Sequence, residues 1–238
     1  MVGIGPGASE DRTRRAETAI NHSQLLVGYT PYVETIADLV GERETYTSGM
    51  RQEVERCRYA LAKAADGTVV SLISSGDPGV YGMAGLAIEL AAAEGLTVPI
   101  EIVPGVTAAT VAAAALGAPL MLDFAVISLS DLLVPWETIR HRLDCVSQSD
   151  TTVVLYNPRS KRRIRQLEEA VEIFRQHRPA ETPVGIVTSA STLEQTLVVT
   201  DLDHLLQQEV TMLSTVIIGS NATKIIDGWL VTSRGYQL

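Results

Sequence analysis

Short apolar runs alternate with helical patterns along the whole chain. The runs are only a few residues long, and several are rich in β-branched residues, as expected for strands that are covered on both faces. The predicted strands are Met1–Ile4, Gln24–Val27, Val69–Ser74, Ile100–Val103, Ala125–Leu129, Thr152–Tyr156, Val184–Val187, Gln195–Val199 and Thr215–Ile218. The predicted helices between them include Glu53–Ala65, Tyr81–Glu94, Ala108–Leu116, Trp136–Val146 and Lys161–Gln176. This alternation predicts an α/β protein with mainly parallel sheets.

One segment breaks the alternation. Gly and Pro interrupt an alanine-rich helix within 117–123, before a new series of strands begins. We therefore predict two α/β lobes, residues 1–118 and 119–238, with a cleft between them. Such junctions are favoured places for ligands.

Composition and charge exclude several classes of protein. Hydrophobic residues make up 46% of the chain and charged residues 20%, so a large core can be buried. The formal net charge of -9 repels nucleic acid and anionic membranes, and we expect neither as a partner. Cys57 and Cys145 provide neither a disulfide framework nor the spacing of a metal site. No stretch approaches the length of a membrane span, and the first residues lack the order of a signal peptide, so we expect a cytoplasmic protein without a metal.

The turn at 3–8 is the first candidate for chemistry. Gly3-Ile4-Gly5-Pro6-Gly7-Ala8 follows a predicted strand and formally fits the dinucleotide fingerprint. Pro6 removes a backbone N–H that a pyrophosphate would need, and the second strand ends in Gly28-Tyr29 without an acid for a ribose. Nicotinamide binding is thereby disfavoured. A tight strand-to-helix turn without a ligand remains an alternative.

Three further strand ends carry glycine or proline. Ser74-Ser75-Gly76-Asp77-Pro78-Gly79-Val80-Tyr81-Gly82 forms a tight loop whose backbone can approach a ligand closely. Asp77 could instead cap the next helix or stabilise the turn. Val103-Pro104-Gly105-Val106-Thr107-Ala108-Ala109 and Leu155-Tyr156-Asn157-Pro158 follow in the same way, although close helix packing or an ordinary turn would explain each one alone.

Taken together, GIGPG, SSGDPGVYG, VPGVTAA and LYNP resemble, in this order and spacing, the tetrapyrrole methylase family of class III methyltransferases. The resemblance covers essentially the whole chain. Gly49-Met50-Arg51 and the segment 127–137, with its Ser-Leu-Ser-Asp stretch, are similar to the branch that methylates C17 of precorrin-3B.

The resemblance implies two α/β lobes with S-adenosylmethionine between them, a precorrin-type tetrapyrrole as substrate, and a homodimer. Pro6 and its loop are expected to face the macrocycle and the transferred methyl group. The cofactor contacts that the resemblance implies are Pro6, Gly76, Asp77, Pro78, Tyr81, Thr107, Ala108, Tyr156, Asn157, Ala190 and Ile218.

Two departures from the family affect the choice of catalytic residues. Ala8 and Ser9 stand where many members have an aspartate after the glycine turn. Gly28-Tyr29 stands where the uroporphyrinogen branch has a catalytic aspartate. Tyr29 and Arg51 are therefore the catalytic candidates in this region.

The C17 branch also contracts the ring, which requires proton movement. Ser130 and Asp131 are candidates for that role, although they could instead cap the helix that starts near Pro135. The basic residues around 159–163 could pair with carboxylates of the substrate, although a solvated helix face would explain Arg163.

Other functions remain open from the sequence. A sibling methylase could act at C11 or C20, or the chain could methylate a modified histidine of a protein. From other classes, a non-catalytic tetrapyrrole-binding protein and a nicotinamide-dependent oxidoreductase remain. The sequence does not distinguish a cobalt-containing substrate from a metal-free one.

Overall fold

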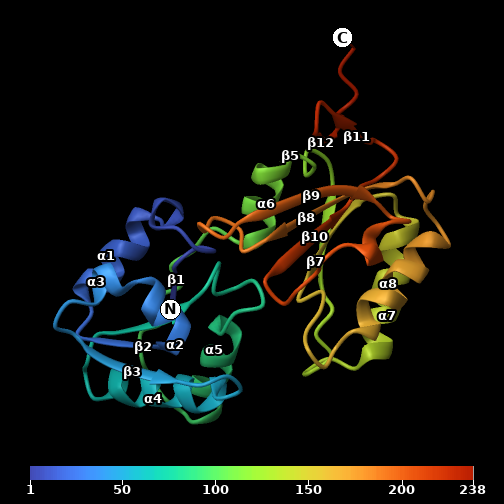
Figure 1. The fold of residues 1–238 in the computed structure, drawn as a ribbon. Helices are drawn as coiled ribbons and strands as arrows, with labels where there is room; N and C mark the ends of the chain where they lie inside the picture. Colours follow the sequence, from blue (N-terminus) through green and yellow to red (C-terminus); the bar gives the residue numbers. More distant parts are fainter. Residues whose placement is uncertain (238) are drawn as a thin grey trace. The chain divides into compact units, whose positions relative to one another are not determined.

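The N-terminal part of the chain forms a parallel sheet in the computed structural model, which describes residues 1–237 (Figure 1). Its strands lie in the order β1-β4-β2-β3, and each neighbouring pair is parallel. Their bounds are Val2–Gly3 for β1, Leu25–Tyr29 for β2, Glu44–Ser48 for β3 and Val70–Ser74 for β4. Because the strands are parallel, their carboxyl ends share one edge of the sheet, where open α/β sheets bind ligands.

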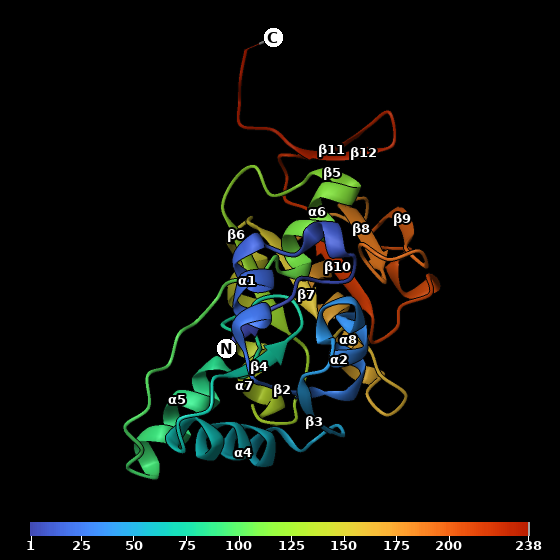
Figure 2. The same cartoon turned by 90° about the vertical axis from the view of Figure 1, so that its left-hand side faces the viewer.

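Helices cover both faces of this sheet. They are α1 (Arg14–His22), α2 (Thr30–Thr35), α3 (Ala37–Val40), α4 (Glu53–Ala65) and α5 (Ala84–Ala93), with a short 3-10 turn at Ser9–Asp11. Successive side chains of a strand point to opposite faces. Accordingly, Leu26 packs with Ile20 of α1, whereas Leu25 and Val27 pack with Cys57 of α4. Figure 2 shows α1 on one side of the strands and α4 and α5 on the other.

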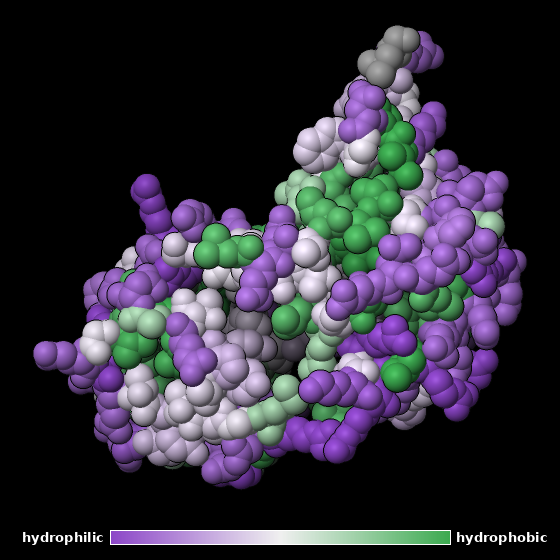
Figure 3. Space-filling view, viewed as in Figure 1, coloured by the Kyte–Doolittle hydropathy of each residue, from purple (hydrophilic) through white to green (hydrophobic). Residues whose placement is uncertain are grey.

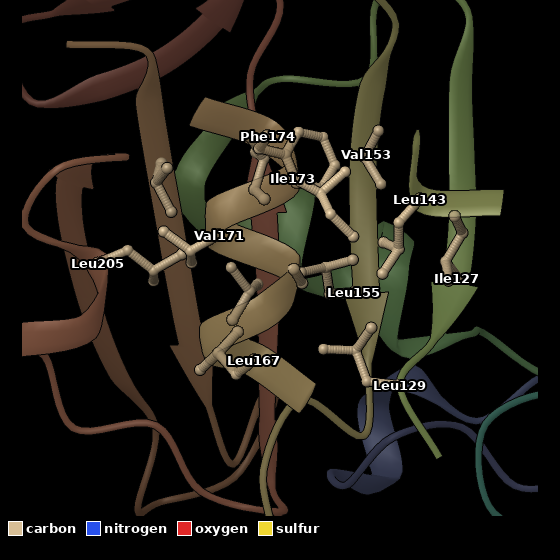
Figure 4. Close-up of a cluster of buried hydrophobic side chains, with 14 of the residues drawn as sticks. Ile127, Leu129, Leu143, Val153, Leu155, Leu167, Val171, Ile173, Phe174 and Leu205 are labelled. Atoms are coloured by element: carbon tan, nitrogen blue, oxygen red, sulfur yellow. The ribbon is translucent and has the colours of Figure 1, made fainter. Parts of the chain in front are cut away.

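The C-terminal part of the chain is built on a five-stranded sheet of order β6-β7-β10-β8-β9. The strands are β6 (Phe124–Ser128), β7 (Thr152–Tyr156), β8 (Pro183–Thr188), β9 (Thr196–Asp201) and β10 (Ser214–Ile218). The helices are α6 (Ala108–Leu116), α7 (Trp136–Gln148) and α8 (Arg165–Arg175), and a 3-10 turn spans Leu205–Gln207. Leu143, Leu155 and Phe174 belong to the core beneath α7 and α8 (Figure 4), whereas α6 packs on the other face with Val154 and Ile217.

A small third sheet completes this part. It contains β5 (Gly117–Ala118), β11 (Thr223–Ile226) and β12 (Trp229–Thr232), with β12 between the other two. The turn between β11 and β12 is Asp227-Gly228, and both residues have positive φ, 50° and 83°. That is the backbone that a tight hairpin turn requires.

The chain divides into two compact units, Met1–Thr107 and Ala108–Leu238. This division falls before α6, whereas the sequence placed the boundary between residues 118 and 119. Helix α6 belongs with the second unit because it packs against β8, β9 and β10. Within residues 1–237, no helix is both long enough and apolar enough to cross a membrane.

The predicted α/β class is confirmed, with one difference in the second unit. Strands β6 and β7 are parallel, but β10 is antiparallel to both β7 and β8, and β9 is antiparallel to β8. Parallel neighbours need a long crossover, usually a helix. The links 189–195 and 202–213 contain no α-helix, so the sheet is mixed.

Several predicted bounds differ from the structure, among them the start of the helix predicted at Lys161–Gln176, which begins at Arg165. The run Ile100–Val103 forms no strand, and only Val103 makes a bridge, with Val2. The helix predicted from Tyr81 begins at Ala84, because Tyr81 has a φ of 53° that a helix does not accommodate.

Candidate functional site

Three glycine-bearing loops of the first unit meet at Gly3, Gly76 and Gly105, which we call the glycine junction. The Gly5 N–H donates to the Gly76 carbonyl at 3.2 Å, and the Gly76 N–H donates back to the Gly5 carbonyl at 2.8 Å. A Cβ on Gly3 would lie 2.6 Å from the Gly76 oxygen, and a Cβ on Gly105 would overlap the same oxygen. The close packing of the backbone is therefore sufficient to explain why Gly3 and Gly105 are glycines.

Asp77 ties two of these loops together. One carboxylate oxygen accepts the Gly79 N–H at 2.8 Å, and the other accepts the Gly105 N–H at 3.1 Å. Helix α5 begins after Met83 without a side-chain cap, so Asp77 stabilises the turn rather than capping that helix. The turn-stabilising alternative raised from the sequence is thus what the structure shows for this carboxylate.

The other candidates of the first unit surround the junction. Pro78 is buried, whereas Pro6 and Thr107 are half-buried. Tyr81 is 58% exposed. The sequence-predicted residues 76, 77, 78 and 107 are therefore brought together at the carboxyl edge of the parallel sheet.

Tyr29 and Arg51 lie at the carboxyl ends of neighbouring strands. Tyr29 is the last residue of β2, and its ring meets the Tyr32 ring edge-on at 5.1 Å between centroids. Arg51 follows β3 in an exposed turn with a φ of 68°, and its N–H donates to Glu53 Oε1 at 3.3 Å. The sequence did not identify Arg56, whose guanidinium lies 5.8 Å from the Tyr29 ring centroid.

Tyr156 and the start of α6 are joined in the second unit. The Ala109 N–H donates to the Tyr156 hydroxyl at 2.7 Å, which satisfies one of the free N–H groups in the first turn of the helix. Ala108, the first residue of α6, is half-buried. This contact brings two of the predicted segments together, because Tyr156 ends β7.

A polar network joins the loops that follow β6 and β7. Asn157, with a φ of 50°, donates from Nδ2 to Ser128 Oγ at 3.0 Å. Arg163 donates to the Asn157 carbonyl at 2.7 Å and to Ser130 Oγ at 3.3 Å. Arg163 is half-buried before the start of α8, so it holds two candidate residues together and does not lie on a solvated helix face.

Burial makes the charge of Arg163 more costly. Desolvation lowers the pKa of Arg163, while the nearby Asp131 carboxylate opposes that shift. The Nε of Arg163 and the Oε1 of Gln166 are buried without a hydrogen-bond partner. Most buried polar atoms have a partner, so these two atoms distinguish the network from the rest of the protein interior.

Asp131 lies at the exposed side of the same network. Its carboxylate accepts a hydrogen bond from Gln166 Nε2 at 2.9 Å. The N-cap of α7 is Pro135, without a side-chain hydrogen bond, so neither Ser130 nor Asp131 caps that helix. Leu132 and Leu133, which follow directly, are 62% and 91% exposed.

The remaining two candidates are buried apolar residues. Ala190, between Ser189 and Ser191 with positive φ, packs in the cluster beneath α6. Ile218 is fully buried in the core beneath α7 and α8. Its side chain is therefore part of that core.

Two further features of the structure concern metal ligands and a cavity. In the described part of the chain, no group of His, Cys, Asp and Glu side chains could hold a metal ion. A cavity of about 510 Å³ lies at the amino-terminal end of β4, with Met1, Val69 and Ser71 among its lining residues. It is thus at the opposite end of the sheet from the glycine junction.

Comparison with known proteins places these features in a family. The sequence profile of the tetrapyrrole (corrin/porphyrin) methylases matches residues 1–206. The probable cobalt-factor III C(17)-methyltransferase of Salmonella typhimurium is 41% identical over 100% of this chain and 99% of its own length. The precorrin-3B C(17)-methyltransferase of a Sinorhizobium species is 39% identical over 95% of this chain and 90% of its own. The cobalt-factor III methyltransferase of Priestia megaterium is 43% identical, but the chain spans only 45% of that protein.

Solved structures agree with the sequence relatives. The crystal structure of the methyltransferase CobJ superposes with a TM-score of 0.93 at 36% identity, covering 98% of each chain. A uroporphyrin-III C-methyltransferase from Thermus thermophilus, complexed with S-adenyl homocysteine, shares the fold with a TM-score of 0.71 at 24% identity. The glycine junction, the loops after β6 and β7, and these full-length similarities lead to one conclusion: the chain belongs to the tetrapyrrole methylase family.

Proposed function

We propose that this protein transfers the methyl group of S-adenosylmethionine to C17 of precorrin-3B or cobalt-precorrin-3, with contraction of the ring, in cobalamin biosynthesis. The observation that carries the proposal is full-length identity of about 40% to relatives named for C17 methylation. The sequence of the Ser-Leu-Ser-Asp loop at 128–131 supports the same branch, and hydrogen bonds from Asn157 and Arg163 hold this loop at the carboxyl end of β6.

Methyl transfer from a sulfonium is a displacement, so the protein chiefly has to align the donor and the acceptor carbon. The electron-rich macrocycle supplies the nucleophile. Ser130 is half-buried and Asp131 is exposed on the same loop, where they can donate to or accept from the polar groups that change during ring contraction. Tyr29 and Arg51 are the corresponding candidates in the first unit.

The glycine junction supports cofactor binding in the first unit. Its loops lie at the carboxyl edge of a parallel sheet, where such folds bind ligands, and Asp77 fixes their shape. We propose contacts to the cofactor from Pro6, Gly76, Asp77, Pro78, Tyr81 and Thr107.

The second unit offers its own set of cofactor residues. Ala108, Tyr156 and Asn157 lie around the hydrogen bond between α6 and β7, and Ala190 packs near the same helix. For Ile218, only backbone contact remains compatible with its burial. Each set is a separate proposal.

The first experiment is a calorimetric titration with S-adenosylhomocysteine, with NAD as the control ligand. Gly76→Val places a branched side chain at a φ of 57°, within the proposed cofactor loop. Gly95→Val is the matched control, because Gly95 has a φ of 65° in the same unit, and a Cβ there would meet nothing within 4 Å. Both variants carry the same kind of backbone strain.

We expect the wild type and Gly95→Val to bind S-adenosylhomocysteine and Gly76→Val to lose binding while remaining folded. If the folded wild type does not bind S-adenosylhomocysteine, the methyltransferase proposal is refuted. A response to NAD would instead support an oxidoreductase.

The position of methylation is tested by product analysis. Incubation with precorrin-3B and, separately, with cobalt-precorrin-3 should give a product that has gained one methyl group at C17. A methyl group at C11 or C20 would assign the chain to a sibling activity. Binding of the tetrapyrrole without turnover would favour a non-catalytic carrier.

We also propose that the protein is a cytoplasmic homodimer. Apolar atoms gather on the second unit around the region of α6, β5 and β9 (Figure 3). Leu197 on β9, together with Ile225, Ile226 and Trp229 on the β11–β12 hairpin, is about half exposed. Sedimentation velocity should give the mass of a dimer, and Ile226→Lys should shift it toward the monomer if this surface is the interface.

A further inference from the structure

Arg56 of α4 is a charged residue in the core of the first unit. Among the fully buried side chains, that of Arg56 is the largest, and the residue is only 2% exposed. Within residues 1–237, no carboxylate forms an ion pair with it. Burying an unpaired charge is expensive, so its position calls for a specific role.

The guanidinium contacts the ends of two neighbouring strands. Its Nε donates to Ser48 Oγ at 2.9 Å, and its Nη2 donates to the Gly49 carbonyl at 2.8 Å. Its Nη1 lies 3.3 Å from the sulfur of Met83, a weak acceptor. Its Cζ lies 5.8 Å from the Tyr29 ring centroid, within the range of a cation–π contact.

These contacts hold two candidate catalytic residues. Tyr29 and Ser48 are paired in register at the ends of β2 and β3. Gly49 is held from both sides, because its N–H donates to Gln52 Oε1 at 2.6 Å while its carbonyl accepts from Arg56. Arg51 sits in the turn that this anchoring fixes.

We propose that Arg56 is a positioning residue, which fixes the Tyr29 ring and the 49–51 turn for the tetrapyrrole. The proposal rests on the methyltransferase function proposed above. A guanidinium without a counter-ion also leaves positive potential at the carboxyl edge of the sheet, which favours a substrate that carries carboxylates. Arg56 acts through its neighbours and does not itself touch the substrate.

The test compares Arg56→Met with Arg178→Met, a matched control in the second unit. Arg178 is also buried, at 6% exposure, and lies 4.9 Å from the Phe174 ring centroid. Its guanidinium donates only to carbonyls, those of Val146, Ser147, Thr151 and Gly219. Arg178→Met therefore removes a buried arginine that contacts no candidate site residue.

Four quantities are measured for each variant: the Tm, the Kd for S-adenosylhomocysteine, and the kcat and KM for the tetrapyrrole. Both methionine variants should lower the Tm and leave the Kd for S-adenosylhomocysteine unchanged. Only Arg56→Met should lower kcat/KM, by about 10- to 100-fold, because small misplacements near reacting groups have effects of this size. Arg56→Lys should restore part of the loss, since its ammonium group can still donate to the Gly49 carbonyl.

Equal kcat/KM values for the folded Arg56→Met and Arg178→Met variants would overturn the positioning role. So would a parallel loss of S-adenosylhomocysteine binding, since that indicates general damage to the first unit. If Arg56→Met does not fold, Ser48→Ala and Arg56→Lys are measured in its place. A kcat/KM equal to that of the wild type in both variants would overturn the positioning role of Arg56. A wild type that binds S-adenosylhomocysteine but turns over no tetrapyrrole would remove the proposed function, and the role of Arg56 with it.

Discussion

Arginine side chains join loops in both units. Arg56 and Arg178 are buried and donate to carbonyl or hydroxyl oxygens, and Arg163 does so from a half-buried position. Arg12 differs, because it forms a bidentate pair with Asp38 at 3.0 and 2.6 Å. The planar guanidinium has five donors in a fixed geometry, which suits it to bridging several acceptors at once.

The Arg12–Asp38 pair should make stability depend on acid pH. The hydrogen bond from Arg12 holds the pKa of Asp38 below its usual value. A depressed pKa contributes stability that is present above the unfolded-state pKa and is lost as the pH falls through the folded-state pKa. Urea unfolding of the wild type and Asp38→Asn should thus differ most near neutral pH and converge in acid. A constant difference at every pH would contradict this assignment.

The two cysteines should differ sharply in reactivity. Cys57 is buried, and desolvation raises the pKa of its thiol to about 11, whereas Cys145 is exposed. Because the thiolate is the reactive form, a thiol reagent at mildly alkaline pH should modify Cys145 in the native protein and both thiols after denaturation. Cys145→Ser is the control, and it should leave the native protein without a rapidly reacting thiol.

At the scale of elements, α6 packs on β8 through a glycine. A Cβ on Gly185 would overlap the side chain of Leu116, which is 2% exposed. This close approach lets the helix lie directly on the sheet, and it explains why a glycine occupies the middle of a buried strand.

Gly185→Ala should therefore destabilise the protein by about 1–3 kcal/mol through overpacking. In a Leu116→Ala background, the same substitution should cost less, because the conflicting side chain is gone. Chemical denaturation of the two single variants and the double variant forms the cycle that checks this coupling. Simple additivity of the two changes would show that Gly185 and Leu116 do not conflict.

The pattern of apolar residues predicted the bounds of buried helices and strands well, but it missed strands that are polar or exposed. The predicted bounds of Glu53–Ala65, Ala108–Leu116 and Thr152–Tyr156 match α4, α6 and β7. Strand β3, Glu44–Ser48, was missed because it is a polar edge strand with no fully buried residue. The β11–β12 hairpin was also missed, although its Asp-Gly turn between apolar runs is a recognised hairpin signal.

The site was predictable only in part, since its residues meet through tertiary contacts. The motifs made Gly76, Asp77 and Asn157 candidates, but they did not show that Asp77 bridges to Gly105 or that Asn157 donates to Ser128. Arg56 could not be singled out, because a charged residue in an amphipathic helix normally faces solvent. Its burial depends on the chain folding around it.

At the scale of the whole molecule, each hydrophobic cluster lies within one unit. The clusters around Leu26 and Leu72 draw on the first unit, and those around Leu143 and Ile217 draw on the second. No cluster residue is shared between the two units in the described part of the chain.

Core truncations in the two units should consequently be independent. Leu72→Ala and Leu143→Ala should each cost about 2–5 kcal/mol. Native-state hydrogen exchange should show the loss of protection in the strands of the substituted unit, and the double variant should be additive within roughly 0.5 kcal/mol. Strong coupling between the two substitutions would show that the cores do not act separately.

The glycine junction has a consequence for mutational scans of this protein. Because Gly3 and Gly105 each meet the Gly76 carbonyl without room for a Cβ, any side chain there distorts the fold before a ligand is involved. A library scored only by growth without added cobalamin would rank both positions among the most sensitive and invite their assignment as cofactor residues. Scoring the same library for protein abundance would separate the two causes. Substitutions at Gly3 and Gly105 should deplete the folded protein itself, whereas true ligand contacts should leave abundance intact.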